Sequence, residues 1–129
     1  MPDSRDTTRG SCQPADQRPA HIARLDFSRG QTPENLAVEP SGSADVTFAE
    51  PAQVARVSPG GKVRVLAQLP KPTDGAACPV LVPLLRAPAL TVGNVRDHAG
   101  RLYAALCTGS PRLQGIWRID PGGSALVPR

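Results

Sequence analysis

Gln53–Gly61 reads QVARVSPGG, and Gly115–Gly123 reads GIWRIDPGG, 62 positions further along the chain. Both stretches have the form apolar-x-Arg-apolar, followed by Ser or Asp and then by Pro-Gly-Gly. In such a corner the polar side chain caps its own backbone, proline presets φ at about −65°, and glycine adopts positive φ. We therefore predict a hairpin corner at the end of each stretch, with one strand before it and another after it.

The similarity extends upstream of both corners. A glycine-led strand pattern precedes each copy, Gly42–Phe48 (GSADVTF) and Gly100–Leu106 (GRLYAAL), and these two segments are 58 positions apart. Because the spacing then grows to 62, we predict a longer turn in the second copy, over 108–114. The pattern predicts a repeat of one structural unit, and the alternative is two ordinary hairpins that share a turn tetrapeptide.

The apolar runs between the corners predict an all-β fold. They are short and are separated by Pro, Gly and Ser, which favours strands over helices. In the second copy Ile116 lies on one face of the strand, and Trp117 and Ile119 lie on the other. A sheet that is apolar on both faces must be covered on both, as a propeller blade is covered by its neighbours. We predict a partial β-propeller of about two four-stranded antiparallel blades, with Trp117 between them.

The predicted strands are 35–39, 44–49, 53–58 and 62–67 in the first unit, and 90–96, 101–106, 115–120 and 124–128 in the second.

The domain organisation follows from composition. Residues 1–20 are polar and contain proline, so they cannot bury enough apolar area to offset chain entropy, and we predict a disordered tail. Residues 21–129 form the partial propeller, with blade one over about 33–67 and blade two over about 90–128. An irregular, proline-rich connection over 69–88 joins the two blades.

Charge and composition argue against several classes of partner. The formal net charge is +4, but the arginines are scattered, so the chain has no basic stripe for nucleic acid. No stretch approaches the roughly 20 apolar residues of a membrane helix, and the N-terminus lacks the apolar segment of a secretory signal. We expect no nucleic-acid partner, no membrane span and, by default, a cytoplasmic location.

The three cysteines, Cys12, Cys78 and Cys107, are widely spaced and show no CxxC pattern. With no histidine at ligand spacing, this argues against a structural zinc site. We expect Cys78 and Cys107 to be small apolar thiols, and a single disulfide is the alternative.

Pro33–Gly42 (PENLAVEPSG), followed by Val46–Phe48 (VTF), Gln53–Val57 (QVARV) and Gly61–Val63 (GKV), resembles the opening blade of the senescence marker protein/gluconolactonase (regucalcin-like) family. The resemblance covers about residues 22–129 and implies the first two blades of a six-bladed β-propeller. NHL-repeat and strictosidine synthase-like propellers share the same blade pattern.

For function, this resemblance implies a metal-dependent hydrolase of lactones or related esters, in which calcium or zinc polarises a carbonyl or activates water. Glu34 matches the position of one metal ligand of the family, at the start of the first innermost strand. Alternatively, Glu34 is a solvated turn residue beside Pro33. The remaining ligands would come from later blades, so we do not expect this chain alone to retain the metal or to be active. Catalytic and substrate-binding residues stay unassigned.

Two departures from the family favour a different function. Leu90–Arg101 lacks the Asn-Asp pair in the register of the family's substrate-recognition stretch, and Ala44-Asp45 stands where Leu-Tyr is usual. The alternative is therefore a non-catalytic propeller module, NHL-like or strictosidine synthase-like, that binds a partner. Two blades would leave two open apolar faces, so we also expect weak stability or self-association.

Overall fold

The computed structural model describes residues 19–73, 78, 89–122 and 125–126. This part of the chain is all-β apart from one 3₁₀ turn, η2 (Phe27–Arg29), and it includes no helix that could cross a membrane. Most of the predicted tail (1–20) and of the predicted connection (69–88) lies outside the described residues, as does Cys12.

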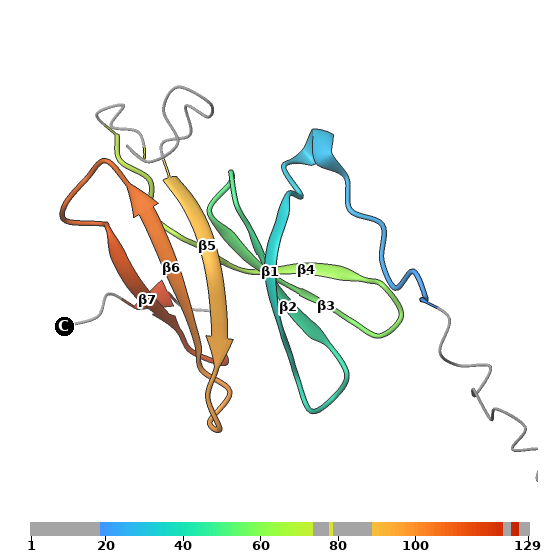
Figure 1. Cartoon of the computed structure of the whole chain (residues 1–129). Coiled ribbons are helices and arrows are strands. Elements are labelled where there is room, and N and C mark those ends of the chain that lie inside the picture. The colour runs from blue at the N-terminus through green and yellow to red at the C-terminus, as the bar shows by residue number, and fades with distance from the viewer. Residues whose placement is uncertain (1–18, 74–77, 79–88, 123–124, 127–129) are drawn as a thin grey trace, which may run out of the picture.

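Two antiparallel sheets make up the fold (Figure 1). Sheet A contains, in spatial order, β1 (Pro33–Val38), β2 (Ala44–Phe48), β3 (Gln53–Val57) and β4 (Val63–Gln68). Sheet B contains β5 (Ala89–Arg96), β6 (Leu102–Thr108), β7 (Gly115–Ile119) and the two-residue β8 (Ala125–Leu126). Each strand pairs with the next along the chain. The predicted all-β class is confirmed, and the strand ends differ from prediction by at most two residues wherever the chain is described.

The first Pro-Gly-Gly corner has the predicted turn chemistry. The Lys62 N–H donates to Ser58 Oγ at 3.0 Å, and the Gly61 N–H donates to the Ser58 carbonyl at 2.8 Å. Gly61 has a φ of 88°, which favours glycine. A Cβ at Gly61 would also lie 2.6 Å from the Ile22 carbonyl oxygen, so the corner touches the N-terminal segment. Gly123 of the second corner lies outside the described residues.

The hairpins β1–β2 and β5–β6 turn in the same way. The Glu39 N–H donates to the Ser43 carbonyl at 2.7 Å, and the Asp97 N–H donates to the Arg101 carbonyl at 3.0 Å. The positions of these two bonds differ by 58, the spacing found in the sequence. Sheets A and B therefore share one hairpin arrangement. Equivalent residues are 58 positions apart up to the ends of β2 and β6, and 62 positions apart from the starts of β3 and β7 onward.

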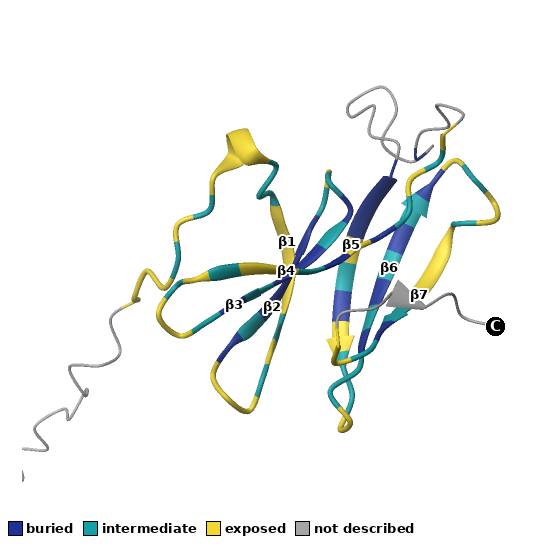
Figure 2. Ribbon diagram, turned by 180° about the vertical axis from the view of Figure 1, so that it is seen from behind, coloured by how far each residue is buried: buried dark blue, intermediate teal, exposed yellow. Residues whose placement is uncertain are grey.

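The two sheets face each other across an apolar core, seen as the buried faces of the strands in Figure 2. Trp117 is 5% exposed within this core, and its Nε1 donates to the Leu113 carbonyl at 2.8 Å. The prediction that Trp117 lies between the two units is confirmed. The core consists of Ala52, Val54, Ala67, Leu69, Ala89, Leu102, Ala104, Leu106, Trp117 and Ile119.

The opposite face of sheet A is covered by residues 21–26, which we call the strap. Ala23 and Leu25 of the strap pack against a buried cluster formed by Val46, Phe48, Ala55 and Val57. An apolar groove of about 430 Å³ remains between the strap and β1. The centre of this face is therefore closed by the chain's own N-terminal segment.

The opposite face of sheet B differs. Val95 is 65% exposed and Ile116 is 53% exposed, and Val92 beside them is also exposed. Half-buried Tyr103 and Ala105 lie across from them in the strand register. We call these five residues the open face. We expected two units to leave two open apolar faces. Among the described residues sheet B has such a face, whereas Ala23 and Leu25 of the strap pack on the other one, on sheet A.

Candidate functional site

Glu34 lies at the seam where β1 of sheet A runs beside β5 of sheet B (Figure 1). It is the second residue of β1, so it is part of a strand and not of a turn. The Gly93 N–H donates to Glu34 Oε2 at 2.5 Å. Gly93 occupies a bulge in β5 with a φ of 71°, which frees its N–H from the ladder and directs it across the seam. The Glu34 carboxylate is thus tied to the neighbouring sheet while its side chain remains exposed.

Asn35 completes this end of the seam. Its Oδ1 accepts from the Leu36 N–H at 2.6 Å, and its carbonyl accepts from Thr47 Oγ1 at 3.2 Å. A Cβ added at Gly93 would lie 3.6 Å from Asn35 Nδ2, so the two sheets approach closely here. Asn35 therefore makes local bonds and contacts the next sheet.

The side chains around Glu34 do not by themselves form a metal centre. Within the described part of the chain, no three His, Cys, Asp or Glu side chains are grouped so that they could hold a metal ion. Glu34 is a lone candidate ligand, and the group recorded on its carboxylate is the Gly93 N–H, which a cation does not bind. We derive no chemistry through a metal from these residues.

Four charged side chains meet further along the seam, and we call them the ionic cluster: Glu39, Asp45, Arg56 and Arg96. Asp45 is fully buried and lies directly opposite Arg56 in the β2–β3 register. Arg56 Nε donates to Asp45 Oδ1 at 2.7 Å, and its Nη2 donates to Glu39 Oε1 at 2.9 Å. The buried carboxylate is therefore compensated, as a buried charge must be.

Arg96 extends the ionic cluster from sheet A to sheet B. Its Nε lies 2.9 Å from Glu39 Oε2, but the N–H is not directed at that oxygen, so the contact is an ion pair without a well-formed hydrogen bond. Glu39 thus stands between an arginine of its own sheet and an arginine of the other. The cluster holds the two sheets together by charge at this end of the seam.

Proton affinity within the cluster is perturbed. A side-chain hydrogen bond with Asp45 raises the pKa of Glu39, and burial and the negative charge of Asp45 raise it further, while Arg56 and Arg96 oppose the shift. The hydrogen bond with Asp45 likewise raises the pKa of Arg56, so the guanidinium stays charged. Glu39 therefore takes up a proton more readily than an isolated glutamate does as the pH falls.

Asn94 and Thr91 of β5 make polar bonds to the backbone of β2. Asn94 is buried, and its Nδ2 donates to the Asp45 carbonyl at 3.0 Å, while its Oδ1 has no hydrogen-bond partner among the described residues. Thr91 Oγ1 donates to the Phe48 carbonyl at 2.7 Å. Both side chains are therefore used to join the sheets.

Sheet B repeats the carboxylate of the ionic cluster at Asp97, the equivalent of Glu39. Asp97 Oδ2 accepts from Arg101 Nε at 2.6 Å and from the Tyr103 hydroxyl at 3.2 Å. Desolvation opposes ionisation, but the hydrogen bonds from Arg101 and Tyr103 outweigh it and lower the pKa of Asp97 to about 2. This carboxylate stays ionised at every pH near neutrality.

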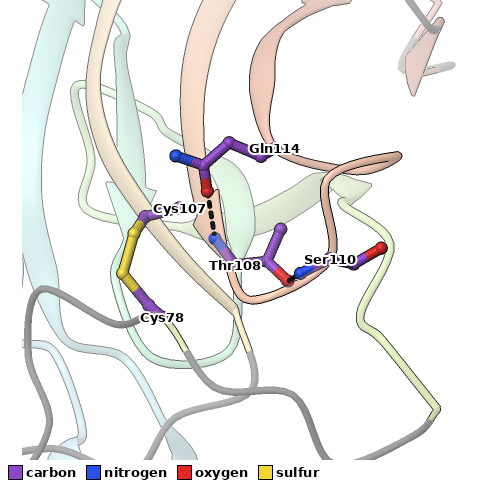
Figure 3. Close-up of a disulfide and its surroundings, with 5 residues drawn as sticks. All are labelled: Cys78, Cys107, Thr108, Ser110 and Gln114. Carbon is purple, nitrogen blue, oxygen red and sulfur yellow. Dashed lines mark hydrogen bonds between the residues drawn. A yellow bond between two sulfur atoms is a disulfide. The ribbon is translucent and has the colours of Figure 1, made fainter.

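Cys78 and Cys107 form a disulfide (Figure 3), so the expectation of two separate thiols is wrong and the alternative of a single disulfide holds. Cys78 is fully buried against Leu90, and Ala49 packs beside them. The bond joins residues 29 positions apart and anchors the connection between the sheets to the end of β6. Cys107 occupies the face of β6 that is turned away from the core, where a partner from the connection can reach it.

The turn that follows this disulfide is fixed by side-chain bonds (Figure 3). The Thr108 N–H donates to Gln114 Oε1 at 2.9 Å, and the Ser110 N–H donates to Thr108 Oγ1 at 3.1 Å. The predicted longer turn over 108–114 is therefore a closed loop with bonds across its base.

Sequence reasoning missed the ionic cluster, although a signal for it was present. It marked Asp45 only as a departure from the family, whose burial without a partner would cost roughly 2 kcal/mol or more. The signal is the pair of opposite charges on two strands predicted to form one hairpin, 44–49 and 53–58. Those bounds set Asp45 opposite Val57, because the first strand is predicted one residue too long. With β2 ending at Phe48, Asp45 and Arg56 each lie three residues from the turn and directly opposite each other, so the pair depends on a strand end that the sequence did not define.

No protein-family model and no curated protein matches this sequence, so what the chain does has to be argued from the geometry described above.

Proposed function

We propose that this chain is a two-blade section of a β-propeller that acts as a non-catalytic interaction module and binds its partner through the open face of sheet B. The observation that supports this is the unequal exposure of equivalent residues. Val54 of sheet A is fully buried against sheet B, whereas Ile116, which follows the same repeat, is 53% exposed. Ala37 packs against the core, whereas its equivalent Val95 is 65% exposed. The open face therefore consists of positions whose equivalents in sheet A pack against the neighbouring sheet.

The partner in this proposal is a second copy of the chain. The strap fills the centre of the outer face of sheet A, where Phe48 is 1% exposed and Val57 is 6% exposed. A second copy therefore meets the first with its own open face, and two identical faces associate about a two-fold axis. Exposed apolar patches of this kind mark interaction sites.

The test is the molecular mass in solution as a function of protein concentration, measured by analytical ultracentrifugation. We expect a monomer–dimer equilibrium for the unaltered chain and a monomer for Ile116→Lys, which places a charge in the centre of the open face. The matched control is Val38→Lys, which places the same charge at an exposed valine on sheet A, 65% exposed against 53% for Ile116.

Each outcome of this experiment decides the proposal. Dimers that persist in Val38→Lys and disappear in Ile116→Lys support symmetric pairing through the open face. Loss of association in both variants would instead indicate head-to-tail stacking of sheet B on sheet A. A monomer at every concentration overturns the proposed partner.

A second candidate function is the metal-dependent hydrolase activity that the family resemblance implies. Its support is Glu34, an exposed carboxylate on β1 whose Oε2 is oriented by the Gly93 N–H, as the second shell of a metal site orients a ligand. Further ligands would have to come from outside the described residues, because a single carboxylate holds a divalent cation weakly.

Calcium and zinc titrations followed by calorimetry test this candidate. Glu34→Gln should weaken binding relative to Glu50→Gln, a change at an exposed glutamate in the β2–β3 turn. Equal affinity in both variants would remove Glu34 from any metal site and leave the interaction module as the only candidate.

A further inference from the structure

The second unit departs from the repeat at one place, the turn between β6 and β7. Four residues separate Phe48 from Gln53 in sheet A, whereas eight separate their equivalents, Leu106 and Gly115, in sheet B. The additional residues build the closed loop whose base is fixed by Thr108 and Gln114. This loop has no counterpart in sheet A, so it is a feature of the second unit alone and is not needed to form the repeated sheet.

The loop and the end of β4 enclose a cleft of about 510 Å³. A second hollow of about 520 Å³ shares Lys71 and Trp117 with it and continues along Gln68, Leu69 and Pro70. Both volumes are in the range of small-molecule sites. The residues that line the first cleft are Lys71, Pro72, Thr73, Ser110, Arg112, Leu113 and Trp117.

The charges of the cleft are all of one sign. Lys71 and Arg112 are exposed and line the cleft from two separate segments, the first from the residues that follow β4 and the second from the loop. Among the described residues that line the two hollows none is acidic, and none of the ion pairs found in the described part of the chain involves these two cations. The hydroxyls of Thr73 and Ser110, which also line this cleft, add hydrogen-bond donors.

The floor of the cleft is apolar and held in place. Trp117 is fixed by its bond from Nε1 to the Leu113 carbonyl, and Leu113 and Pro72 line the walls beside it. Two cations above an apolar floor match a ligand with an anionic group and an apolar body. Sheet A has Ala55 at the position equivalent to Trp117, so this combination occurs only in the second unit.

We propose that this cleft binds a small organic anion, with a carboxylate or phosphate between Lys71 and Arg112 and the apolar part of the ligand against Trp117. Arginine and lysine bind both anions through charge-assisted hydrogen bonds. The site is independent of the open face, because Trp117 and Ile116 lie on opposite faces of β7.

The experiment uses Trp117 as its own reporter, since it is the only tryptophan of the chain. Its fluorescence is recorded during titration with benzoate, phenyl phosphate and inorganic phosphate at constant ionic strength, and benzyl alcohol is the neutral control. We expect a saturable change with at least one of the aromatic anions and none with benzyl alcohol. Benzoate alone would identify a carboxylate site and phenyl phosphate alone a phosphate site.

Four single variants then locate the binding. Lys71→Ala and Arg112→Ala should each weaken binding by about tenfold or more, the usual effect of losing a charge-assisted hydrogen bond. Lys62→Ala and Arg64→Ala remove the same charges from exposed positions away from the cleft and should leave the affinity unchanged. All four changes are at exposed side chains, and thermal melts check that each variant is folded.

Two results would overturn the proposal. One is the absence of any saturable change with all three anions. The other is an equal loss of affinity in all four variants, which would indicate attraction by net charge alone.

Discussion

Asp45 is a charged residue with no exposure to solvent, and its stability depends on Arg56. Replacing Arg56 with methionine keeps the aliphatic stem but leaves the Asp45 carboxylate buried without its partner. Breaking a buried pair in this way costs about 3 kcal/mol or more. We expect the urea-induced unfolding midpoint of Arg56→Met to fall accordingly.

The control for this change is Arg64→Met. Arg64 is the cross-strand partner of Arg56 on β4, is exposed and makes no ion pair with another described residue. A surface change of this kind alters the unfolding free energy by about 0.5 kcal/mol or less. Equal losses in the two variants would contradict the assignment of Arg56 as the compensating charge.

Asp97 predicts a defined pH dependence of stability. Its pKa in the folded chain is about 2, below the ordinary value of 3.8. As the pH falls between these two values, the carboxyl group becomes protonated in the unfolded chain before it does in the folded chain. The stability contributed by Asp97 is complete above about pH 4 and is lost as the pH falls towards 2. Asp97→Asn should remove this loss, measured as the difference between the unfolding free energies of the two proteins across this range.

Glu39 acts in the opposite sense, because its pKa is raised. Its folded form binds the proton more tightly, so its contribution to stability is lost as the pH rises through the folded pKa. Comparing Asp97→Asn with the unaltered protein at every pH isolates the contribution of Asp97, because Glu39 is present in both proteins. A direct titration of the Asp97 carboxyl carbon by NMR that gave an ordinary pKa would contradict the Asp97 prediction.

At the scale of elements, Gly61 joins the first corner to the strap. Both Gly42 and Gly61 have positive φ, 87° and 88°, so alanine at either position is strained by about 1 to 2 kcal/mol. A Cβ added at Gly42 would meet only Pro59 Cγ, at 3.5 Å. A Cβ added at Gly61 would lie 2.6 Å from the Ile22 carbonyl oxygen. We expect Gly61→Ala to displace the strap in addition to straining the turn.

Trypsin cleavage after Arg24, followed by mass spectrometry, measures release of the strap. Cleavage should be faster in Gly61→Ala than in Gly42→Ala, although the two variants share the same backbone strain. Equal rates would show that the corner does not hold the strap.

The disulfide joins Cys78, from the segment between the two sheets, to the end of β6. Closing a loop of 29 residues is expected to stabilise the fold by about 3 to 4 kcal/mol through the unfolded state. Reduction, or Cys107→Ala, should lower the unfolding free energy by this amount, measured by urea denaturation with and without reductant. Cys12→Ala is the control and should leave the reductant-dependent difference intact.

At the scale of the whole molecule, local patterns predicted the strands and their order, and long-range contacts were not predictable. The Pro-Gly-Gly corners and the alternation around Trp117 depend on neighbouring residues, which the sequence displays directly. The Cys78–Cys107 bond and the strap depend on how irregular segments return to a sheet, and no periodicity encodes that path. Glu34 is intermediate: its strand was predicted, but its bond to Gly93 requires the bulge in β5.

The same limit explains the cleft. The difference between spacings of 58 and 62 predicted a longer turn, yet it could not indicate that Lys71, from a segment about 40 residues away, would lie across from Arg112. Only the packing of sheet A on sheet B brings the end of β4 to this loop.

The strap has a consequence for how far any assembly can grow. A molecule with an exposed apolar sheet face at each end can bind a further copy at both ends and form an open-ended fibre. The strap covers the centre of the outer face of sheet A, so a pair that formed through the open face, as proposed, would leave only the groove beside β1 for a further copy. On this proposal residues 21–26 limit assembly to a pair, and we expect a chain that lacks them to form larger aggregates.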